Sequence, residues 1–283
     1  MLQDISPKHL YNEYRPKEQV SDDDYVICFC QEEVLLVEGD LLDYPTYGML
    51  KSALKTDAVR YIFSIDQEKY FLYDGNKVFP EKDNNDVSCR YIPMAEIRGH
   101  IVKPRYQQYA LYTAKHLRDW YRDNKFCGRC GRQMHHSDTE RCMVCGDCNF
   151  HSYPRIMPAV IVGVTNGDKI LLTKYRTGYG HNALIAGFVE IGETIEECVQ
   201  REVMEEAGVK VKNIRYYKSQ PWGIPNDILV GYYCDVDGDD TITMDGSELK
   251  YADWVSREDI VLQPDDISLT NEMMKKFKNH EEI

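Results

Sequence analysis

Three glutamates stand close together in the second half of this 283-residue chain. Glu202, Glu205 and Glu206 are spaced i, i+3 and i+4, so a helix places all three on one face. Like charges at this spacing repel one another unless a cation lies between them. Hard divalent cations such as Mg²⁺ bind through a few carboxylates together with substrate phosphates. The cluster therefore predicts a metal platform for phosphate chemistry, with a solvated acidic helix face as the alternative.

Local signals predict the helix that must carry these carboxylates. Thr194 followed by Glu197 forms the S/T-x-x-E pattern of a capping box, so the helix should begin near residue 194. Gly208 suits the left-handed position at which a helix ends. Gly187 should begin the loop that turns the chain into the helix.

The stretch Gly187–Val209 resembles the Nudix box, G-x5-E-x7-R-E-U-x-E-E-x-G-U with U aliphatic, and matches every fixed position. This resemblance implies hydrolysis of a nucleoside diphosphate linked to another moiety, with Mg²⁺ or Mn²⁺. It also implies that Arg201 pairs with box carboxylates and positions them. The implied catalytic and metal-binding set is Glu193, Arg201, Glu202, Glu205, Glu206, the backbone of Ala186, and Glu248, with Asp245 and Glu258 as rival registers for Glu248. The general base stays open between Glu205 and Glu206.

Five of the ten cysteines lie between residues 127 and 148. Cys127, Cys130, Cys145 and Cys148 read C-x2-C-x14-C-x2-C, the spacing of a tetrahedral four-thiolate zinc site. Cys142 with Cys145 forms a competing second pair, and spacing alone leaves both open. Four thiolates close the coordination shell, so the zinc should be structural and one thiol is left over. We expect the remaining cysteines to pack in cores, and they are Cys28, Cys30, Cys89, Cys198 and Cys234.

A zinc ribbon directly before a Nudix box resembles the NADH pyrophosphatase, or NAD-capped RNA hydrolase, subfamily. In that subfamily an aromatic-Pro-Arg/Gln step follows the second cysteine pair, and Tyr153-Pro154-Arg155 stands at this distance from Cys148. The resemblance therefore favours Cys145 and Cys148 as the second pair. It also implies that Glu140, five residues before Cys145, lies near the substrate, although an exposed ribbon carboxylate is the alternative.

The segment 219–227 reads S-Q-P-W-G-I-P-N-D, where the subfamily carries S-Q-P-W-P-F-P-x-S. The segment departs from that motif at three positions, Gly223, Ile224 and Asp227. The glycine loosens the backbone, and the isoleucine removes an aromatic face. The aspartate adds negative charge beside an anionic substrate. The departures leave the preferred dinucleotide open, and a rigid proline loop is the structural alternative. The implied substrate contacts are Arg90, Glu140, Tyr153, Phe188, Gln220, Trp222 and Thr270. A core phenylalanine is the alternative for Phe188, and an exposed solubilising arginine for Arg90.

Composition is that of an ordinary globular protein, with 43% apolar and 29% charged residues. The net charge of −13 argues against a nonspecific nucleic-acid binder, although bound metal ions can still admit a polyanionic substrate. We find no basic-then-apolar leader and no apolar run of membrane-spanning length, so we expect a cytoplasmic protein with no membrane partner. A homodimer is expected from the family resemblance alone.

The predicted fold class is α+β: a mostly β domain over residues 1–124, the zinc ribbon over 125–153, and a Nudix α/β/α sandwich with a mixed sheet over 154–283. The predicted strands are Tyr25–Gln31, Glu33–Glu38, Arg60–Asp66, Lys69–Asp74, Pro158–Thr165, Lys169–Lys174, Val209–Tyr217, Asp227–Val236 and Lys250–Val255. Besides the box helix, the predicted helices are Tyr47–Leu54, Arg105–Asn124 and Ser268–His280.

The sequence thus predicts metal-dependent hydrolysis of the pyrophosphate of NAD(H), giving NMN(H) and AMP, with NAD-capped RNA as a possible further substrate. One alternative is a Nudix pyrophosphatase for ADP-ribose, FAD or a diadenosine polyphosphate. Another, from a different class, is a noncatalytic nucleotide sensor. The acidic triad argues against the sensor, because a sensor has no need for the repulsion between its members.

Overall fold

The computed structural model describes residues 1–39, 41–80, 87–99, 104–178, 180–244, 246 and 249–283. These residues form two compact units, each of which is described by itself. One unit comprises Asp4–Arg155 together with Gly223–Pro225. The other comprises Met1–Gln3, Ile156–Trp222 and Asn226–Ile283.

A six-stranded mixed sheet forms the centre of the Asp4–Arg155 unit, in the order β1-β4-β5-β2-β3-β6. Its strands are β1 (Leu10–Tyr11), β2 (Tyr25–Cys30), β3 (Glu33–Val37), β4 (Arg60–Ile65), β5 (Glu68–Asp74) and β6 (Cys89–Pro93). β2 and β5 run parallel, and the other neighbouring pairs are antiparallel. Val26, Leu35 and Phe71 belong to the buried apolar cluster of this sheet. The mostly β character predicted for this part of the chain is confirmed.

The longest helix of this unit is α3 (Arg105–Asp123). Of the apolar residues that predict an amphipathic helix here, Leu111, Tyr112 and Trp120 are buried, and Tyr109 and Leu117 are half-buried. The shorter helical segments are α1 (Tyr47–Leu50), η1 (Thr56–Ala58) and α2 (Met94–Gly99).

The ribbon belongs to the same unit and contains a small antiparallel sheet of β7 (Met134–His136), β8 (Met143–Cys145) and β9 (His151–Ser152). Cys127 donates its backbone N–H to Arg132, and Gly131 donates to Cys127. Gly131 has φ +73°, a left-handed conformation that closes this first knuckle at little cost for glycine. Both cysteine pairs are thus carried on short turns beside the sheet.

The second unit is built on a mixed sheet in the order β13-β14-β10-β11-β15, with β12 also paired to β10. Its strands are β10 (Met157–Asn166), β11 (Lys169–Tyr175), β12 (Ile185–Phe188), β13 (Val211–Trp222), β14 (Asp227–Val236) and β15 (Leu249–Ser256). β10 and β14 run parallel, and the remaining pairs are antiparallel. β10 is rich in buried β-branched residues, and β14 is buried over most of its length, as expected of strands covered on both faces.

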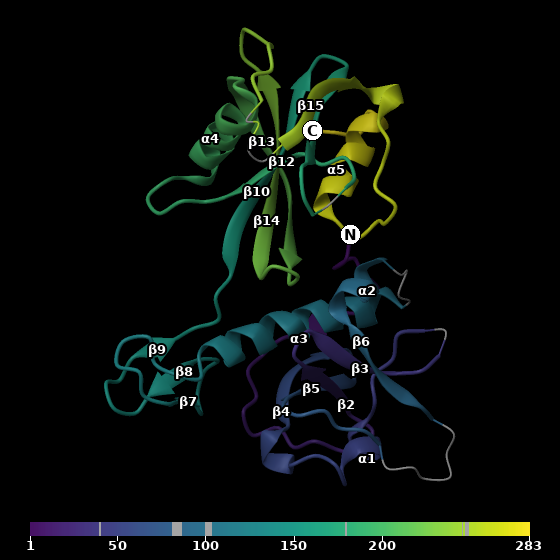
Figure 1. The fold of residues 1–283 in the computed structure, drawn as a ribbon, viewed down its shortest axis with the longest axis vertical. Helices are drawn as coiled ribbons and strands as arrows, with labels where there is room; N and C mark the ends of the chain where they lie inside the picture. The colour runs from purple at the N-terminus through teal and green to yellow at the C-terminus, as the bar shows by residue number, and fades with distance from the viewer. Residues whose placement is uncertain (40, 81–86, 100–103, 179, 245, 247–248) are drawn as a thin grey trace. The chain divides into compact units, whose positions relative to one another are not determined.

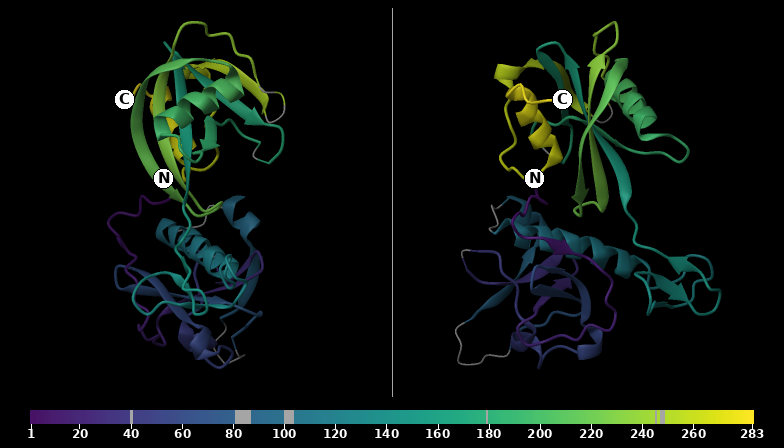
Figure 2. Two further views of the ribbon diagram at one scale, coloured as in Figure 1. Left: turned by 90° about the vertical axis from the view of Figure 1, so that its left-hand side faces the viewer. Right: turned by 180° about the vertical axis from the view of Figure 1, so that it is seen from behind.

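Helices α4 (Ile195–Ala207) and α5 (Leu269–Lys278) cover opposite faces of this sheet (Figures 1 and 2). On the α4 side, Val199 and Val203 pack with Val160, Val162 and other strand residues in one buried cluster. A short turn, η2 (Arg257–Asp259), precedes α5. Both the mixed sheet and the α/β/α layering agree with the prediction. No helix among the described residues is long and apolar enough to cross a membrane.

Met1–Gln3 belongs to this second unit although it lies far from it in sequence. Leu2 is fully buried and donates its backbone N–H to Ile267 at 2.9 Å. The side-chain amide of Gln3 donates to the carbonyl of Ser219 at 3.2 Å. These contacts join the N-terminal residues both to the loop before α5 and to β13.

Most predicted elements are present, with ends shifted by a few residues. The strand predicted at Asp227–Val236 is β14, with the same bounds. The helix predicted at Tyr47–Leu54 forms only a single turn, Tyr47–Leu50, and lacks a side-chain cap. The strand predicted at Val209–Tyr217 instead runs from Val211 to Trp222, because pairing with β14 extends it through two irregularities in register.

Candidate active site

Helix α4 begins and ends where the sequence signals place it. The hydroxyl of Thr194 accepts from the backbone N–H of Glu197, and the Glu197 carboxylate accepts from the backbone N–H of Thr194 at 2.7 Å. This reciprocal capping box satisfies two of the N–H groups that a helix start leaves unpaired. Gly208 has φ +69° and donates to the carbonyl of Met204, which ends the helix.

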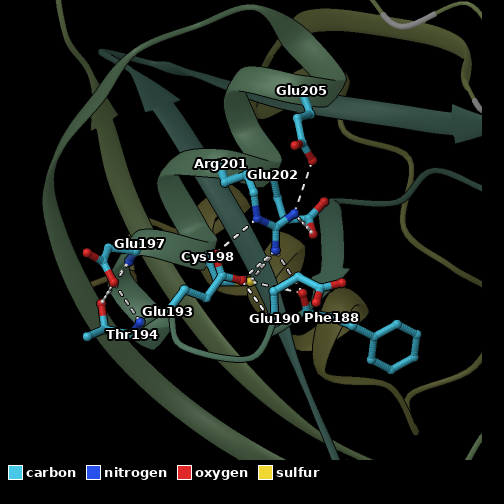
Figure 3. A network of polar contacts seen from close by, with 9 residues as sticks. All are labelled: Phe188, Glu190, Glu193, Thr194, Glu197, Cys198, Arg201, Glu202 and Glu205. Carbon is cyan, nitrogen blue, oxygen red and sulfur yellow. Dashed lines mark hydrogen bonds and ion pairs between the residues drawn. The ribbon is translucent and has the colours of Figure 1, made fainter.

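The Arg201 guanidinium is surrounded by carboxylates from the loop before α4 and from α4 itself (Figure 3). Its Nε donates to Glu193 Oε2 at 3.0 Å, and its Nη1 donates to Glu202 Oε1 at 2.7 Å and to Glu205 Oε2 at 3.0 Å. Its Nη2 donates to the carbonyl of Phe188 at 2.9 Å. One guanidinium thus joins the loop before α4 to two successive turns of the helix, and it offsets the repulsion among the acidic residues.

The environments of these carboxylates differ. Hydrogen bonds from Arg201, and then from the backbone N–H of Glu190, lower the pKa of Glu193 to about 2. Burial raises the pKa of Glu202, and the neighbouring Arg201 opposes that rise. Glu206 is only 5% exposed, whereas the side chain of Glu205 is largely exposed. The helix therefore presents two buried carboxylates and one exposed carboxylate.

Gly187 makes room for one of the buried carboxylates. A Cβ added at this position would lie 1.9 Å from Cδ of Glu202, so any larger residue would occupy the place of that carboxylate. Gly187 is on β12, opposite Val160, and the half-buried Ala186 precedes it. Three carboxylates, those of Glu193, Glu202 and Glu205, share one guanidinium here. Carboxylate oxygens are the donors that Mg²⁺ or Mn²⁺ prefers. Among the described residues, however, the carboxylates of α4 do not form a group whose ligand atoms lie within 4.8 Å of one another.

The ribbon brings four thiols together. One sulfur each from Cys127, Cys130, Cys145 and Cys148 lies within 4.8 Å of the others. Sγ of Cys127 is 3.6 Å from that of Cys148, and Sγ of Cys130 is 3.5 Å from that of Cys145. These separations suit a tetrahedral zinc with bonds of about 2.3 Å. Cys142 is not part of the group, so Cys145 and Cys148 form the second pair.

Comparison with known families agrees with this geometry. Residues 155–277 match the NUDIX domain, and residues 122–153 match the NADH pyrophosphatase zinc ribbon domain. This chain carries a Nudix domain behind an NADH pyrophosphatase zinc ribbon. The four-thiolate cluster is accordingly the zinc site of that ribbon.

The NAD-capped RNA hydrolase NudC of Salmonella schwarzengrund (strain CVM19633) is 46% identical over 149 residues, which are 52% of this chain and 58% of that protein. The protein of the same name from Klebsiella pneumoniae (strain 342) is 46% identical over 150 residues, again 52% of this chain and 58% of the relative. The matched region thus spans less than two thirds of these relatives. A crystal structure of a NUDIX hydrolase from Nitrosomonas europaea is 21% identical, with a TM-score of 0.49, over 55% of this chain and 91% of that one.

Phe188 of the Nudix domain faces outward. Its side chain is 50% exposed, which excludes the alternative of a core phenylalanine. Its backbone carbonyl accepts from both Arg201 and the thiol of Cys198. The backbone of Phe188 is therefore tied to the Arg201 network, while its ring points away from the carboxylates (Figure 3). Ile191, three residues later in the same loop, is fully exposed.

Gln220 is fully buried, and its amide is engaged on every side. Its Nε2 donates to the carbonyl of Ile267 at 2.8 Å and to Gln3 Oε1 at 2.9 Å, and its Oε1 accepts from the backbone N–H of Leu269 at 2.7 Å. Gln220 thereby fixes the start of α5. Thr270, which is half-buried, lies in the first turn of that helix. The contacts of Gln220 suit a residue that positions this turn.

The three departures from the S-Q-P-W motif have different settings. Asp227, expected to place a charge beside the substrate, is only 5% exposed at the start of β14, where burial raises its pKa to about 6. Gly223, expected to loosen the backbone, belongs to the Asp4–Arg155 unit, where a Cβ on it would lie 2.1 Å from the carbonyl oxygen of Tyr112. Close packing is thus a sufficient reason for glycine here. Trp222 is buried, and Ile224 is half-buried.

Other predicted residues have simpler surroundings. In the ribbon, the hydroxyl of Tyr153 donates to Glu140 Oε1 at 3.1 Å, and both side chains are exposed. Arg90 on β6 is exposed, with its Nε 3.6 Å from Glu38. The predicted metal ligand Glu248 and its rival Asp245 lie outside the described residues. The other rival, Glu258, is exposed in η2.

Sequence reasoning missed two kinds of participant. The carbonyl of Phe188 and the backbone N–H of Glu190 orient Arg201 and Glu193, and backbone groups carry no signal in side-chain spacing. Cys142 and His151 lie together beside Glu140 in the ribbon. The sequence presents Cys142 as a rival zinc ligand or as a spare thiol with a redox or packing role. The antiparallel pairing of β8 with β9 brings His151 near it.

Proposed function

We propose that this protein is a Nudix hydrolase that cleaves the pyrophosphate of NAD(H) to NMN(H) and AMP, and that it also removes NAD caps from RNA. The observation that carries the proposal is the combination of an NADH pyrophosphatase zinc ribbon with a Nudix domain in which Arg201 holds the acidic residues of α4. The two similar NudC proteins, which are NAD-capped RNA hydrolases by name, add support.

In this proposal Glu202 and Glu206 hold the cation from their buried positions, and Glu205 completes the set from the exposed side. Arg201 keeps Glu202 and Glu205 in place through its Nη1, so its role is positioning. Bound Mg²⁺ or Mn²⁺ would neutralise charge on the pyrophosphate and lower the pKa of a water. In the balanced reaction a water oxygen bonds to one phosphorus, the bridging oxygen leaves with the other, and a proton is released. Glu205 and Glu206 remain the candidates for general base.

We assign the exposed face of Phe188 to stacking on a base or nicotinamide ring. Tyr153, Glu140, Trp222, Thr270 and Arg90 stay predicted substrate contacts on the strength of the family resemblance. For Gln220 the buried amide network supports a positioning role at the start of α5. Ala186 and Glu248 stay predicted metal ligands on the same family grounds.

A second candidate is the same hydrolysis on another dinucleotide, such as ADP-ribose, FAD or a diadenosine polyphosphate. The specific observation in its favour is Asp227, a buried carboxyl at the position where the subfamily carries serine. A noncatalytic sensor has less support, because it has no use for three carboxylates around one guanidinium.

The deciding experiment is a hydrolysis panel with and without added Mg²⁺ or Mn²⁺ over NADH, NAD⁺, ADP-ribose, FAD and NAD-capped RNA, with products separated by chromatography. Release of NMN(H) from NADH or capped RNA in preference to the other substrates supports the proposal. Preference for another dinucleotide supports the second candidate. Absence of metal-dependent turnover on every substrate refutes both and favours the sensor.

The matched control for the panel is Glu206→Gln, which removes the charge of a buried ligand and keeps its shape. Turnover should fall at least about 10²-fold, since a metal-binding charge at the reacting phosphates is lost. Circular dichroism and zinc content should remain those of the parent. Near-normal turnover in Glu206→Gln with Mg²⁺ would contradict the metal platform.

We also propose a cytoplasmic location and, from the family resemblance, a homodimer. Light scattering on the purified chain tests the second expectation directly, and a monomer at assay concentrations that is fully active would contradict it.

A further inference from the structure

The ribbon contains a second cluster of metal-ligand side chains outside the four thiolates. Glu140, Cys142 and His151 each offer one ligand atom, and these atoms lie within 4.8 Å of one another. Sγ of Cys142 is 4.0 Å from Nδ1 of His151 and 3.9 Å from Oε1 of Glu140. The three residues come from two places in the ribbon: the turn before β8 and the start of β9.

These separations are close to those of a tetrahedral metal site. With bonds of about 2.0–2.3 Å to nitrogen, oxygen and sulfur, tetrahedral ligands lie about 3.3–3.6 Å apart. The observed separations are a few tenths of an ångström longer, a difference that small side-chain rotations can close. Thiolate, imidazole and carboxylate are all ligands of zinc-type cations.

Outer contacts already orient two of the three ligands. Nε2 of His151 lies 3.3 Å from Oδ1 of Asn149. An amide oxygen can only accept a hydrogen bond, so Nε2 carries the hydrogen in this pair. The lone pair of the ring is then on Nδ1, which faces Cys142. Asn149 is held by its own backbone bond to Cys145 and has φ +53°. The hydroxyl of Tyr153 donates to the Glu140 carboxylate. Metal-binding histidines and carboxylates commonly have such partners.

The burial of Cys142 bears on the alternative of a simple reactive thiol. The residue is only 1% exposed, so a dissolved oxidant or electrophile has little access to it.

We propose that Glu140, Cys142 and His151 bind a second zinc-type divalent cation, separate from the four-thiolate zinc. Three protein ligands leave the fourth tetrahedral position open to water or an exogenous anion, whereas the four-thiolate site is closed. The second ion is therefore the more weakly held and the more easily exchanged of the two.

Metal content of the full-length protein tests the proposal, with Zn²⁺ alone as the probe. Parent and variants all carry Glu202→Gln and Glu206→Gln, so that the carboxylates of α4 do not hold a further Zn²⁺. After equilibration against a buffered series of free Zn²⁺, the parent should hold two equivalents at the upper end and one at the lower end. His151→Gln and Cys142→Ser should hold one throughout. The matched control His135→Gln, which alters an exposed ribbon histidine outside the cluster, should still hold two.

Two further measurements sharpen the test. Asn149→Gly removes the partner of His151 and tolerates the positive φ, so it should weaken the second equivalent by about 10–100-fold without affecting the first. With Co²⁺ as the probe, the second equivalent should add a single-thiolate absorption band that Cys142→Ser abolishes.

A parent protein that never exceeds one equivalent would overturn the proposal. So would a second equivalent that persists in both His151→Gln and Cys142→Ser. Because Glu140 is also a predicted substrate contact, the readout is metal content and not hydrolysis, and its outcome is independent of the proposed function.

Discussion

At the scale of single residues, the active-site geometry depends on one missing side chain. The Glu202 carboxylate lies against Gly187. It occupies the position that a methyl group on residue 187 would take. Arg201 then holds that carboxylate from the other side. Glycine is required at this position because of that contact. Its backbone φ is not positive, so the backbone conformation does not demand glycine.

Gly187→Ala should therefore displace Glu202 from the metal platform. We expect turnover to fall on the order of 10²-fold, since a shift of about 1 Å in a positioned group has that effect. Steady-state kinetics on the preferred dinucleotide measures this. Gly180→Ala is the control, because nothing lies within 4 Å of a Cβ at that position. Equal activity of the two variants would contradict the role given to Gly187.

Asp227 provides a prediction about pH. Burial raises the pKa of its carboxyl from 3.8 to about 6, so the folded state binds this proton more tightly than the unfolded state does. Stability contributed by the protonated form is present at about pH 4 and is lost as the pH rises to about 6. Above that window the buried charge destabilises the Nudix unit.

Asp227→Asn should remove this dependence. At pH 8 the variant should be more stable than the parent by about 1–3 kcal/mol, and the difference should vanish or reverse near pH 4. Denaturant unfolding of both proteins at several pH values measures the difference. The exposed Asp253→Asn is the control and should follow the parent. A pH-independent difference between parent and Asp227→Asn would contradict the assignment.

At the scale of elements, α4 depends on its caps as well as on its packing. Thr194 and Glu197 exchange hydrogen bonds at the first turn, directly after the loop that carries Glu193. Because Glu193 binds Arg201, fraying of this turn would also loosen the carboxylates. The capping box thus links helix stability to the geometry of the site.

Thr194→Ala should lower stability by about 1 kcal/mol, within a range of about 0.5–2 kcal/mol for lost caps. Chemical denaturation measures it, with Thr194→Ser as the control that keeps a hydroxyl. If serine and alanine were equally destabilising, the loss would have to come from the threonine methyl and not from the cap.

Elements with strong local signals were predicted well, and those defined by distant partners were not. The capping box and Gly208 bracket α4, and the adjacent strands predicted at Pro158–Thr165 and Lys169–Lys174 form the hairpin of β10 and β11. In contrast, β6 and β12 are short strands that form by pairing with β3 and β10. No local sequence pattern predicts either strand. The same reasoning applies to side chains: the resemblance to the S-Q-P-W motif indicates Gln220, but only the position of α5 shows that its amide is buried.

At the scale of the whole molecule, one metal site lies in one unit and the carboxylates of α4 lie in the other. Small β structures such as β7–β9 bury little apolar surface, so the four-thiolate zinc should supply much of the ribbon's folding free energy. The Nudix unit has its own buried core around α4.

Zinc removal by a chelator should therefore unfold the ribbon selectively. Limited proteolysis followed by mass spectrometry should show new cleavages within 125–153, while 195–207 stays protected. Cys145→Ser should behave like the chelated protein, whereas Cys142→Ser should retain the four-thiolate zinc and its protection. Loss of that zinc in Cys142→Ser would mean that the assignment of the second cysteine pair is wrong.

The burial of Leu2 against Ile267 has a consequence for biosynthesis. A ribosome adds about 5–20 residues per second, so Leu2 is made roughly 13–53 s before its partner. During that interval its apolar side chain has no native place in the Nudix unit. Final closure of this unit must wait until the segment leading into α5 has left the ribosome, while the sheet of β1–β6 has all its strands long before.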